Sequence, residues 1–297
     1  MSGKFTEQAL LLGSRKSLVG ILTRPTPAQT ANPAIVILNT GIVHRVGHYR
    51  MYVTMARFWA SAGYTVLRFD FSGIGDSERR ADQLSPVNAC LADIKEALDS
   101  LEEHHRISQF VLVGLCSGAD HAVLYGHTDP RVVGLVLMDP SIPPTARYYF
   151  HYVAQRLRSL RNWISVATGR SGLLRLLMAQ FFYGLRVSGR TGELRLEGLQ
   201  FDPYLARCYE NSVSRGIRIL AAFTSISPRQ TYRQQMLDAF PDVHFNDQLK
   251  LIYFPESDHL FSAQKDRSKL NQAIMDWFDS ALGAGTFTQA PKSRAFN

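Results

Sequence analysis

Short, continuous apolar runs alternate along the chain with longer stretches of helical periodicity. An apolar run rich in β-branched residues is typical of a strand buried on both faces of a parallel sheet. Two early runs, Ala9–Leu12 and Leu18–Leu22, instead predict an antiparallel hairpin. Buried strands are predicted at Ala34–Leu38, Thr65–Phe69, Phe110–Val113, Val132–Met138, Ile217–Phe223 and Leu249–Phe254.

Amphipathic segments follow these strands. They predict helices at Tyr49–Ser61, Pro86–Glu102, about Arg229 to Ala239, and Asp266–Leu282. Repeated alternation of strand and helix predicts a mostly parallel sheet, because neighbouring parallel strands need a crossover connection. The expected fold class is therefore α/β, with helices on both faces of the sheet.

The alternation stops after Pro140 and resumes at Ile217. Between them, from Pro143 to about Arg215, the sequence is helical, aromatic and rich in arginine, which predicts a cap inserted above the carboxyl ends of the strands. We expect residues 1–142 and 216–283 to form the two parts of the core, 143–215 a helical cap, and 284–297 a disordered tail.

The arginines of the predicted cap allow three interpretations. The cap could roof an apolar acyl pocket while its arginines face a phosphorylated carrier or an acidic partner. It could lie on a membrane surface, or simply carry a solvated basic face. The formal net charge of +8 agrees with each. No nucleic-acid motif accompanies the charge, so no nucleic-acid partner is expected.

Composition narrows the class of protein further. Apolar residues make up 45% of the 297 residues and charged residues 20%, as in ordinary globular proteins. No apolar run is long enough to span a bilayer, and the chain starts without a secretory signal, so a cytoplasmic location is expected. Three scattered cysteines without C-x-x-C spacing predict neither a disulfide framework nor a zinc site, and no cofactor is expected.

One cysteine stands in a pattern that favours reactivity. The segment Gly114-Leu115-Cys116-Ser117-Gly118 falls directly between a predicted strand and a helix. A nucleophile at such a tight turn needs neighbours without bulky side chains, and a helix N-terminus favours the thiolate. The Ser117 N–H can then donate to a developing oxyanion. A buried structural cysteine, or Ser117 as the nucleophile, remain as alternatives.

With this turn, three further segments make the chain resemble the α/β-hydrolase superfamily. They are Asn39–Arg45, Arg68–Ser77 and Tyr253–Phe261, which occur in the superfamily's order and spacing. The chain is similar to the branch around serine aminopeptidase and monoacylglycerol-lipase-like enzymes. More narrowly, it resembles the cysteine-bearing hydrolases associated with exosortase and exopolysaccharide loci. The resemblance implies the α/β-hydrolase fold.

The resemblance also implies roles for particular residues. It makes Cys116 the nucleophile and His259 the general base. The loop after the strand Ala34–Leu38 becomes the oxyanion loop, in which the N–H of Gly41 or Ile42 joins the Ser117 N–H.

The position of His259 supports its role independently. It follows the last predicted strand by a short loop, which places it on the same rim of the sheet as Cys116. His44, in the oxyanion loop, is the main competing histidine and could instead contact substrate.

The acid that would complete a triad is not evident. Its usual place is the loop after Ile217–Phe223, but Thr224–Arg229 contains no carboxylate. Asp139, at the end of the strand Val132–Met138, is the preferred candidate, although an Asp-Pro pair is also a plain strand exit. Further candidates are Asp238, Asp242 and Asp258. A Cys–His dyad is a further alternative, since a thiol ionises far more readily than a hydroxyl.

Two functions follow from these observations. The first is hydrolysis or transfer of an acyl group, from an ester or a possibly carrier-bound thioester, through an acyl-Cys116 intermediate. The second is a non-catalytic hydrolase-fold protein that binds a lipid or polysaccharide intermediate, or a partner protein. The missing acid motivates the second.

Overall fold

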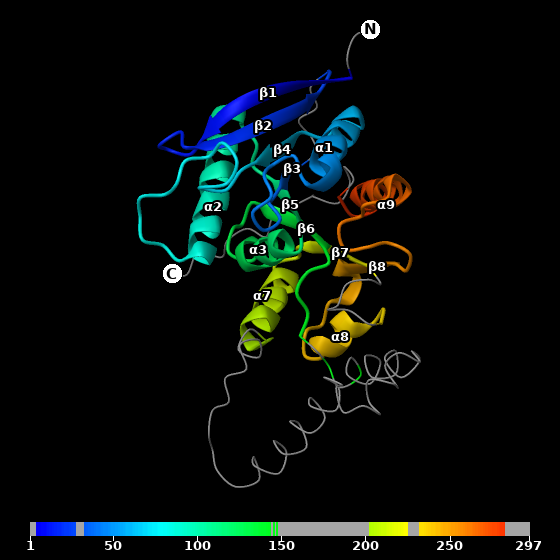
Figure 1. The fold of residues 1–297 in the computed structure, drawn as a ribbon. Helices are drawn as coiled ribbons and strands as arrows, with labels where there is room; N and C mark the ends of the chain where they lie inside the picture. Colours follow the sequence, from blue (N-terminus) through cyan, green and yellow to red (C-terminus); the bar gives the residue numbers. More distant parts are fainter. Residues whose placement is uncertain are drawn as a thin grey trace, which may run out of the picture.

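A single mixed sheet organises the chain (Figure 1). The computed structural model describes residues 4–27, 33–143, 145, 147, 202–224 and 232–282. In this part of the chain, eight strands lie in the order β1-β2-β4-β3-β5-β6-β7-β8. The β1–β2 and β2–β4 pairs are antiparallel and all other pairs are parallel. The strands are β1 (Phe5–Leu12), β2 (Leu18–Pro25), β3 (Ala34–Ile37), β4 (Val66–Phe69), β5 (Phe110–Leu115), β6 (Val132–Met138), β7 (Arg218–Thr224) and β8 (Leu249–Phe254).

Helices cover both faces of this sheet (Figure 1). One face packs against α2 (Pro86–His105), α3 (Ser117–Gly126) and α7 (Asp202–Ser214). The opposite face packs against α1 (Met51–Ser61) and α9 (Gln264–Leu282). Shorter turns complete the described elements: η1 (His48–Arg50), α8 (Gln235–Ala239) and η3 (Asn246–Gln248).

Alternate side chains along the central strands pack into two separate hydrophobic cores, one on each face of the sheet. Ile35 and Ile37 of β3 pack with α1 and α9, whereas Val36 packs with α2 and α3. Successive side chains of a strand point to opposite faces. Both faces of the central strands are buried, which is why they read as continuous apolar runs in the sequence.

The structure confirms the α/β architecture and the predicted strands. Some helix ends differ for local reasons. α1 begins at Met51 rather than Tyr49, because Tyr49 and Arg50 adopt left-handed backbone angles, with φ of 50° and 58°. α2 continues to His105 and ends where Arg106 becomes left-handed, with φ of 58°.

Most of the predicted cap, residues 148–201, and the predicted tail, 284–297, lie outside the described residues. The division of the chain into core and cap therefore stays a prediction. The last part of the range assigned to the cap forms α7, whose Leu205 and Tyr209 are buried in the core beside α3. Within the described ranges, no helix combines the length and apolar character needed to cross a bilayer.

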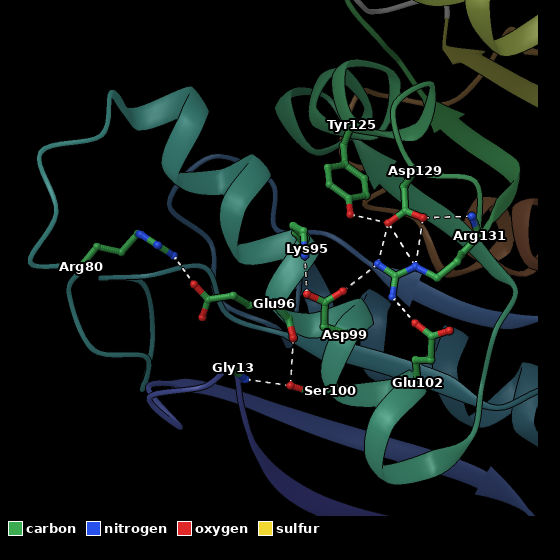
Figure 2. Close-up of polar contacts among 10 residues, drawn as sticks. All are labelled: Gly13, Arg80, Lys95, Glu96, Asp99, Ser100, Glu102, Tyr125, Asp129 and Arg131. Carbon is green, nitrogen blue, oxygen red and sulfur yellow. Dashed lines mark hydrogen bonds and ion pairs between the residues drawn. The ribbon is translucent and has the colours of Figure 1, made fainter.

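A polar network ties α2 to the loop that precedes β6 (Figure 2). The Arg131 guanidinium lies 2.6 Å from Asp129, 2.6 Å from Glu102 and 2.8 Å from Asp99. The Tyr125 hydroxyl donates to the Asp129 carboxylate at 2.6 Å. Burial by itself would raise the pKa of Asp129, but the hydrogen bonds from Arg131 and Tyr125 lower it to about 2.

Replacing Arg131 by methionine should lower the free energy of unfolding by about 1–3 kcal/mol, because the buried Asp129 carboxylate loses its charged partner. Denaturant unfolding at pH 7 measures this. Because the pKa of Asp129 is lowered in the folded protein, its ionised carboxylate contributes to stability. This contribution is complete above pH about 4 and is lost as the pH falls towards 2. The difference between the two proteins should therefore shrink in acid. Lys95→Met, at an exposed ion pair with Asp99, is the control and should change stability little.

Candidate active site

Cys116 occupies a sharp turn between β5 and α3. Its backbone angles, φ 55° and ψ −120°, lie in a region that residues with side chains rarely adopt. The Cys116 N–H donates to the Met138 carbonyl oxygen at 2.8 Å, so the sheet pairing continues up to the turn. The strand thus ends at the residue whose thiol the sequence predicts to be reactive.

The two glycines of the motif permit a close approach of backbones. A Cβ on Gly114 would lie 2.1 Å from the backbone carbon of Gly118. A Cβ on Gly118 would lie 2.6 Å from the carbonyl oxygen of Asn39. No side chain fits at either position, because such distances are well inside van der Waals contact. The Gly-x-Cys-x-Gly spacing is therefore a packing requirement of this turn.

The structure brings His259 to Cys116. His259 lies in the loop after β8, and its ring is half-buried. Hydrogen bonds to Asp139 and to Cys116 raise the pKa of His259 to about 9, against the opposing effect of burial. These two contacts therefore favour the protonated form of the imidazole.

Two neighbouring side chains hold the loop that carries His259. The Asp258 carboxylate accepts hydrogen bonds from the Leu260 and Ser262 N–H groups, at 2.9 and 3.1 Å. Arg267 of α9 donates to the Phe261 carbonyl oxygen at 2.9 Å. The Asp258 carboxylate thus stabilises the loop in which it lies.

Asp139 is the carboxylate that meets the histidine. It follows β6 directly, with φ of 44°, and its Oδ2 lies 2.8 Å from His259 Nδ1. The Asp139 side chain is only 1% exposed. Of the other candidate acids, Asp258 is engaged locally and Asp238 lies 3.6 Å from Arg147. Within the described residues, no contact joins Asp242 to His259.

Thr224 holds the Asp139 carboxylate in place. Its N–H donates to Oδ1 at 2.8 Å, and its hydroxyl donates to Oδ2 at 2.6 Å. Thr224 ends β7 and is completely buried. In the α/β-hydrolase superfamily the acid commonly follows the strand that corresponds to β7. Here the end of β7 instead provides the N–H and the hydroxyl of Thr224, which donate to Asp139 after the neighbouring strand β6.

The loop after β3 approaches the turn at Cys116. A hydrogen bond of 3.0 Å from the Val43 N–H to the Thr40 carbonyl oxygen closes a tight turn, with Gly41 at φ 54°. The Gly41 N–H donates to the Ser117 hydroxyl oxygen at 2.7 Å. Within the described part of the chain, the N–H groups of Ile42 and Ser117 have no hydrogen-bond partner.

A buried ion pair supports the base of this loop. The Asp70 carboxylate, after β4, accepts hydrogen bonds from the side chain and the N–H of Arg45. Asn39 donates to the Val43 carbonyl oxygen at 2.8 Å and to Asp70 at 3.3 Å. Asp70 of the Arg68–Ser77 segment thus fixes the two ends of the loop through hydrogen bonds to Asn39 and Arg45. His44 is exposed, and its Nδ1 accepts the Val46 N–H at 3.4 Å.

The fold and this arrangement define an α/β hydrolase: a strand-to-helix turn with a potential nucleophile, a histidine after the last strand and an acid beside it. The sequence model of the family described as "Serine aminopeptidase, S33" matches residues 31–213, more than half of the chain. The chain belongs to this family of hydrolases. The association with exosortase loci is not shown.

Solved structures agree on the fold. An esterase from Pyrococcus furiosus is 13% identical with a TM-score of 0.58, over 94% of this chain and 91% of that one. A hypothetical protein from Pseudomonas aeruginosa is 17% identical with a TM-score of 0.60, over 95% of each chain. A putative α/β hydrolase from Agrobacterium tumefaciens is 14% identical with a TM-score of 0.58, over 96% of this chain and 100% of that one. No curated protein sequence matches the chain significantly.

The predicted site residues fall into two groups. Cys116, His259 and Asp139 lie together, and the predicted oxyanion residues Gly41, Ile42 and Ser117 surround the same turn. His44 Nδ1 accepts the Val46 N–H, and the predicted substrate contact of His44 stays a prediction. Sequence reasoning missed the role of Thr224 in holding Asp139. The only signal was a hydroxyl at a strand end.

Replacing Thr224 by valine should lower the free energy of unfolding by about 1–3 kcal/mol, because the buried Asp139 carboxylate loses a hydroxyl donor. Thermal or denaturant unfolding measures the change. Thr54→Val provides the control, since the Thr54 hydroxyl is exposed on α1, and its effect should stay within about 0.5 kcal/mol. Equal stability of the two variants would contradict a contribution from the Thr224 hydroxyl.

Proposed function

We propose that this protein hydrolyses or transfers the acyl group of an ester or thioester through an acyl-Cys116 intermediate. One observation carries the proposal: the His259 ring hydrogen-bonds both Cys116 and the buried Asp139 carboxylate. Membership of a hydrolase family supports the same class of reaction. The sulfur, the ring and the carboxylate together form a nucleophile, a proton carrier and an orienting group.

In the resting site, the protonated His259 ring stands beside the sulfur. A neighbouring imidazolium favours the thiolate, as does the N-terminus of α3. The thiolate attacks the carbonyl carbon of the substrate, and the carbonyl oxygen becomes an oxyanion. The unpartnered N–H groups of Ser117 and Ile42 are the donors for that charge.

The tetrahedral species collapses when the leaving group departs. His259 gives its Nε2 proton to the leaving oxygen or sulfur, and the acyl group stays on Cys116 as a thioester. The neutral ring then takes a proton from a water molecule or an acceptor hydroxyl, which attacks the thioester. Collapse of this second intermediate releases the acyl product and restores the thiolate and the imidazolium.

The cysteine indicates the bonds on which the site can act. Exchange between a thiol and a thioester is nearly balanced in free energy, so thioesters and activated esters suit a sulfur nucleophile. The predicted contact of the basic segment with a carrier or a membrane falls on residues 148–201, outside the described ranges. The rival function, a non-catalytic binding module, rested on a missing acid. The hydrogen bond between Asp139 and His259 supports the catalytic function over this rival.

Iodoacetamide at neutral pH should alkylate Cys116 first and abolish hydrolysis of p-nitrophenyl butyrate. Burial raises the pKa values of Cys90 and Cys208 to about 11, so these thiols should react slowly. Cys116→Ala should lower kcat/KM by about 10³-fold or more, and Cys90→Ala should leave it unchanged. Peptide mass spectrometry locates the label. Wild-type activity in Cys116→Ala would exclude the acyl-cysteine mechanism, whereas absence of hydrolysis in the wild-type protein would favour the binding module.

The pH dependence should report the charge on His259. For an alkyl ester such as methyl butyrate, whose leaving group needs a proton, kcat/KM should fall as the pH rises through about 9. The Asp139 hydrogen bond raises this pKa, so Asp139→Asn should move the fall down towards the ordinary histidine value of about 6.5. Titration at constant pH follows the acid released, with Cys116→Ala as the background. An unshifted profile in Asp139→Asn would rule out this coupling.

A further inference from the structure

We propose that the Ser117 hydroxyl is a positioning group that fixes the oxyanion loop, residues 40–43, against the nucleophile. The inference rests on the proposed function, because it explains how the second oxyanion donor of that same reaction is held in position. Ser117 would then act twice: its N–H serves the oxyanion directly, and its hydroxyl holds the second donor in place.

The oxyanion loop is joined to the chain on both sides of Cys116. The Thr40 hydroxyl donates to the Leu115 carbonyl oxygen at 3.1 Å. The Gly41 N–H donates to the Ser117 hydroxyl oxygen at 2.7 Å. Two consecutive loop residues thus bind the residues immediately before and after the cysteine. This double connection sets the position of the loop relative to the sulfur.

The Ser117 contact also decides between the two loop donors. The Gly41 N–H is already bound to Ser117, whereas the next N–H in the turn, that of Ile42, has no partner in the described part of the chain. Ile42 is therefore the loop residue available to an oxyanion. Its N–H follows Gly41 directly, so a shift of Gly41 would move the donor.

Packing contributes little to holding the tip of this loop. The Ile42 side chain is 91% exposed, and apart from Gly41 and its two chain neighbours no described residue has an atom within 4 Å of the place where a Cβ on Gly41 would sit. Hydrogen bonds must therefore fix the tip. A donor has to stand about 3 Å from the oxyanion to stabilise it, so loss of the Ser117 contact should weaken the transition state more than substrate binding.

The two connections differ in how far they can be altered. Thr40 also hydrogen-bonds the Tyr52 hydroxyl, and both side chains are buried under the turn. Removing either hydroxyl would leave its buried partner unsatisfied. The Ser117–Gly41 hydrogen bond is exposed, so Ser117 can be truncated without a comparable penalty. Ser117 is thus the connection that tests the loop separately from the fold.

The same contact bears on Ser117 as an alternative nucleophile. Its hydroxyl oxygen accepts the Gly41 N–H, while His259 hydrogen-bonds Cys116. A base that serves the neighbouring residue leaves Ser117 without activation. Geometry therefore favours a positioning role for this hydroxyl.

The experiment compares Ser117→Ala with Ser117→Thr, which keeps the hydroxyl, and with Ser214→Ala, an exposed serine beyond the site. Four quantities are measured on each protein. They are kcat and KM for p-nitrophenyl butyrate, the inhibition constant of an alkyl trifluoromethyl ketone, and the rate of Cys116 alkylation by iodoacetamide. The ketone forms an oxyanion when the sulfur adds to it, whereas alkylation needs the thiolate but no oxyanion hole.

Ser117→Ala should lower kcat by about 10- to 100-fold, less than the full loss of an oxyanion donor. KM should stay within about threefold, and the affinity for the ketone should fall with kcat. The alkylation rate should not change, Ser117→Thr should recover most of the activity, and Ser214→Ala should match the wild type.

Three results would overturn the positioning role. The first is a wild-type kcat and ketone affinity in Ser117→Ala. The second is an equal loss of alkylation, which would place the effect on the thiolate. The third is a lowered kcat with unchanged ketone affinity, which would place the effect outside the oxyanion hole. A failure of the proposed function shows separately, as undiminished hydrolysis in Cys116→Ala.

Discussion

The hydrogen bond between the Asp139 carboxylate and the His259 ring is the contact on which the site depends. It joins residues 120 positions apart in the sequence, each at the carboxyl end of its strand. With a carboxylate as acceptor, Nδ1 carries a proton and Nε2 is left to face the sulfur. The carboxylate is buried, so its charge is tolerated only because Thr224 and His259 satisfy its oxygens. Without this contact, neither the orientation nor the charge of the ring is determined.

The parallel sheet makes such a meeting possible. β5, β6, β7 and β8 are consecutive neighbours, and their carboxyl ends lie along one edge. Cys116 follows β5, Asp139 follows β6, Thr224 ends β7 and His259 follows β8. The acid commonly follows the strand that corresponds to β7. Asp139 follows the adjacent strand, β6, and can therefore reach the same position beside His259. Because the spacing between adjacent strands is less than 5 Å, Thr224 can hold that acid with a single side chain.

Much of this arrangement could be predicted from the sequence because it depends on local patterns. Continuous apolar runs predicted the strands, and Gly114 and Gly118 indicated a turn too tight for side chains. The position of Cys116 between a strand and a helix followed directly. The acid was less well determined, since its position after a strand favoured Asp139 but only a tertiary contact joins it to His259. Only the register of β6 against β7 places Asp139 within reach of Thr224.

Hydroxyl groups were the least predictable part. Serine and threonine occur throughout the chain, and nothing in their sequence context distinguishes Ser117 or Thr40 from a solvated residue. Their contacts arise because the loop after β3 crosses over the start of α3, which is a consequence of sheet order. The donors that shape the oxyanion loop are therefore visible only when β3 and β5 are seen as neighbours.

In the proposed mechanism, a cysteine at the turn changes what the histidine must do. In a serine hydrolase the ring has to be neutral at the start, because it must remove the proton of the hydroxyl. Here hydrogen bonds to Asp139 and Cys116 raise the pKa of His259 to about 9, which favours the cation as the starting form of the ring. That charge would disable a serine enzyme at neutral pH, but it suits a thiol, which can lose its proton before the substrate arrives. The buried carboxylate raises the pKa of the ring, and the cationic ring in turn favours the thiolate. A hydroxyl in place of the sulfur would need a neutral ring as its base, which the same carboxylate disfavours.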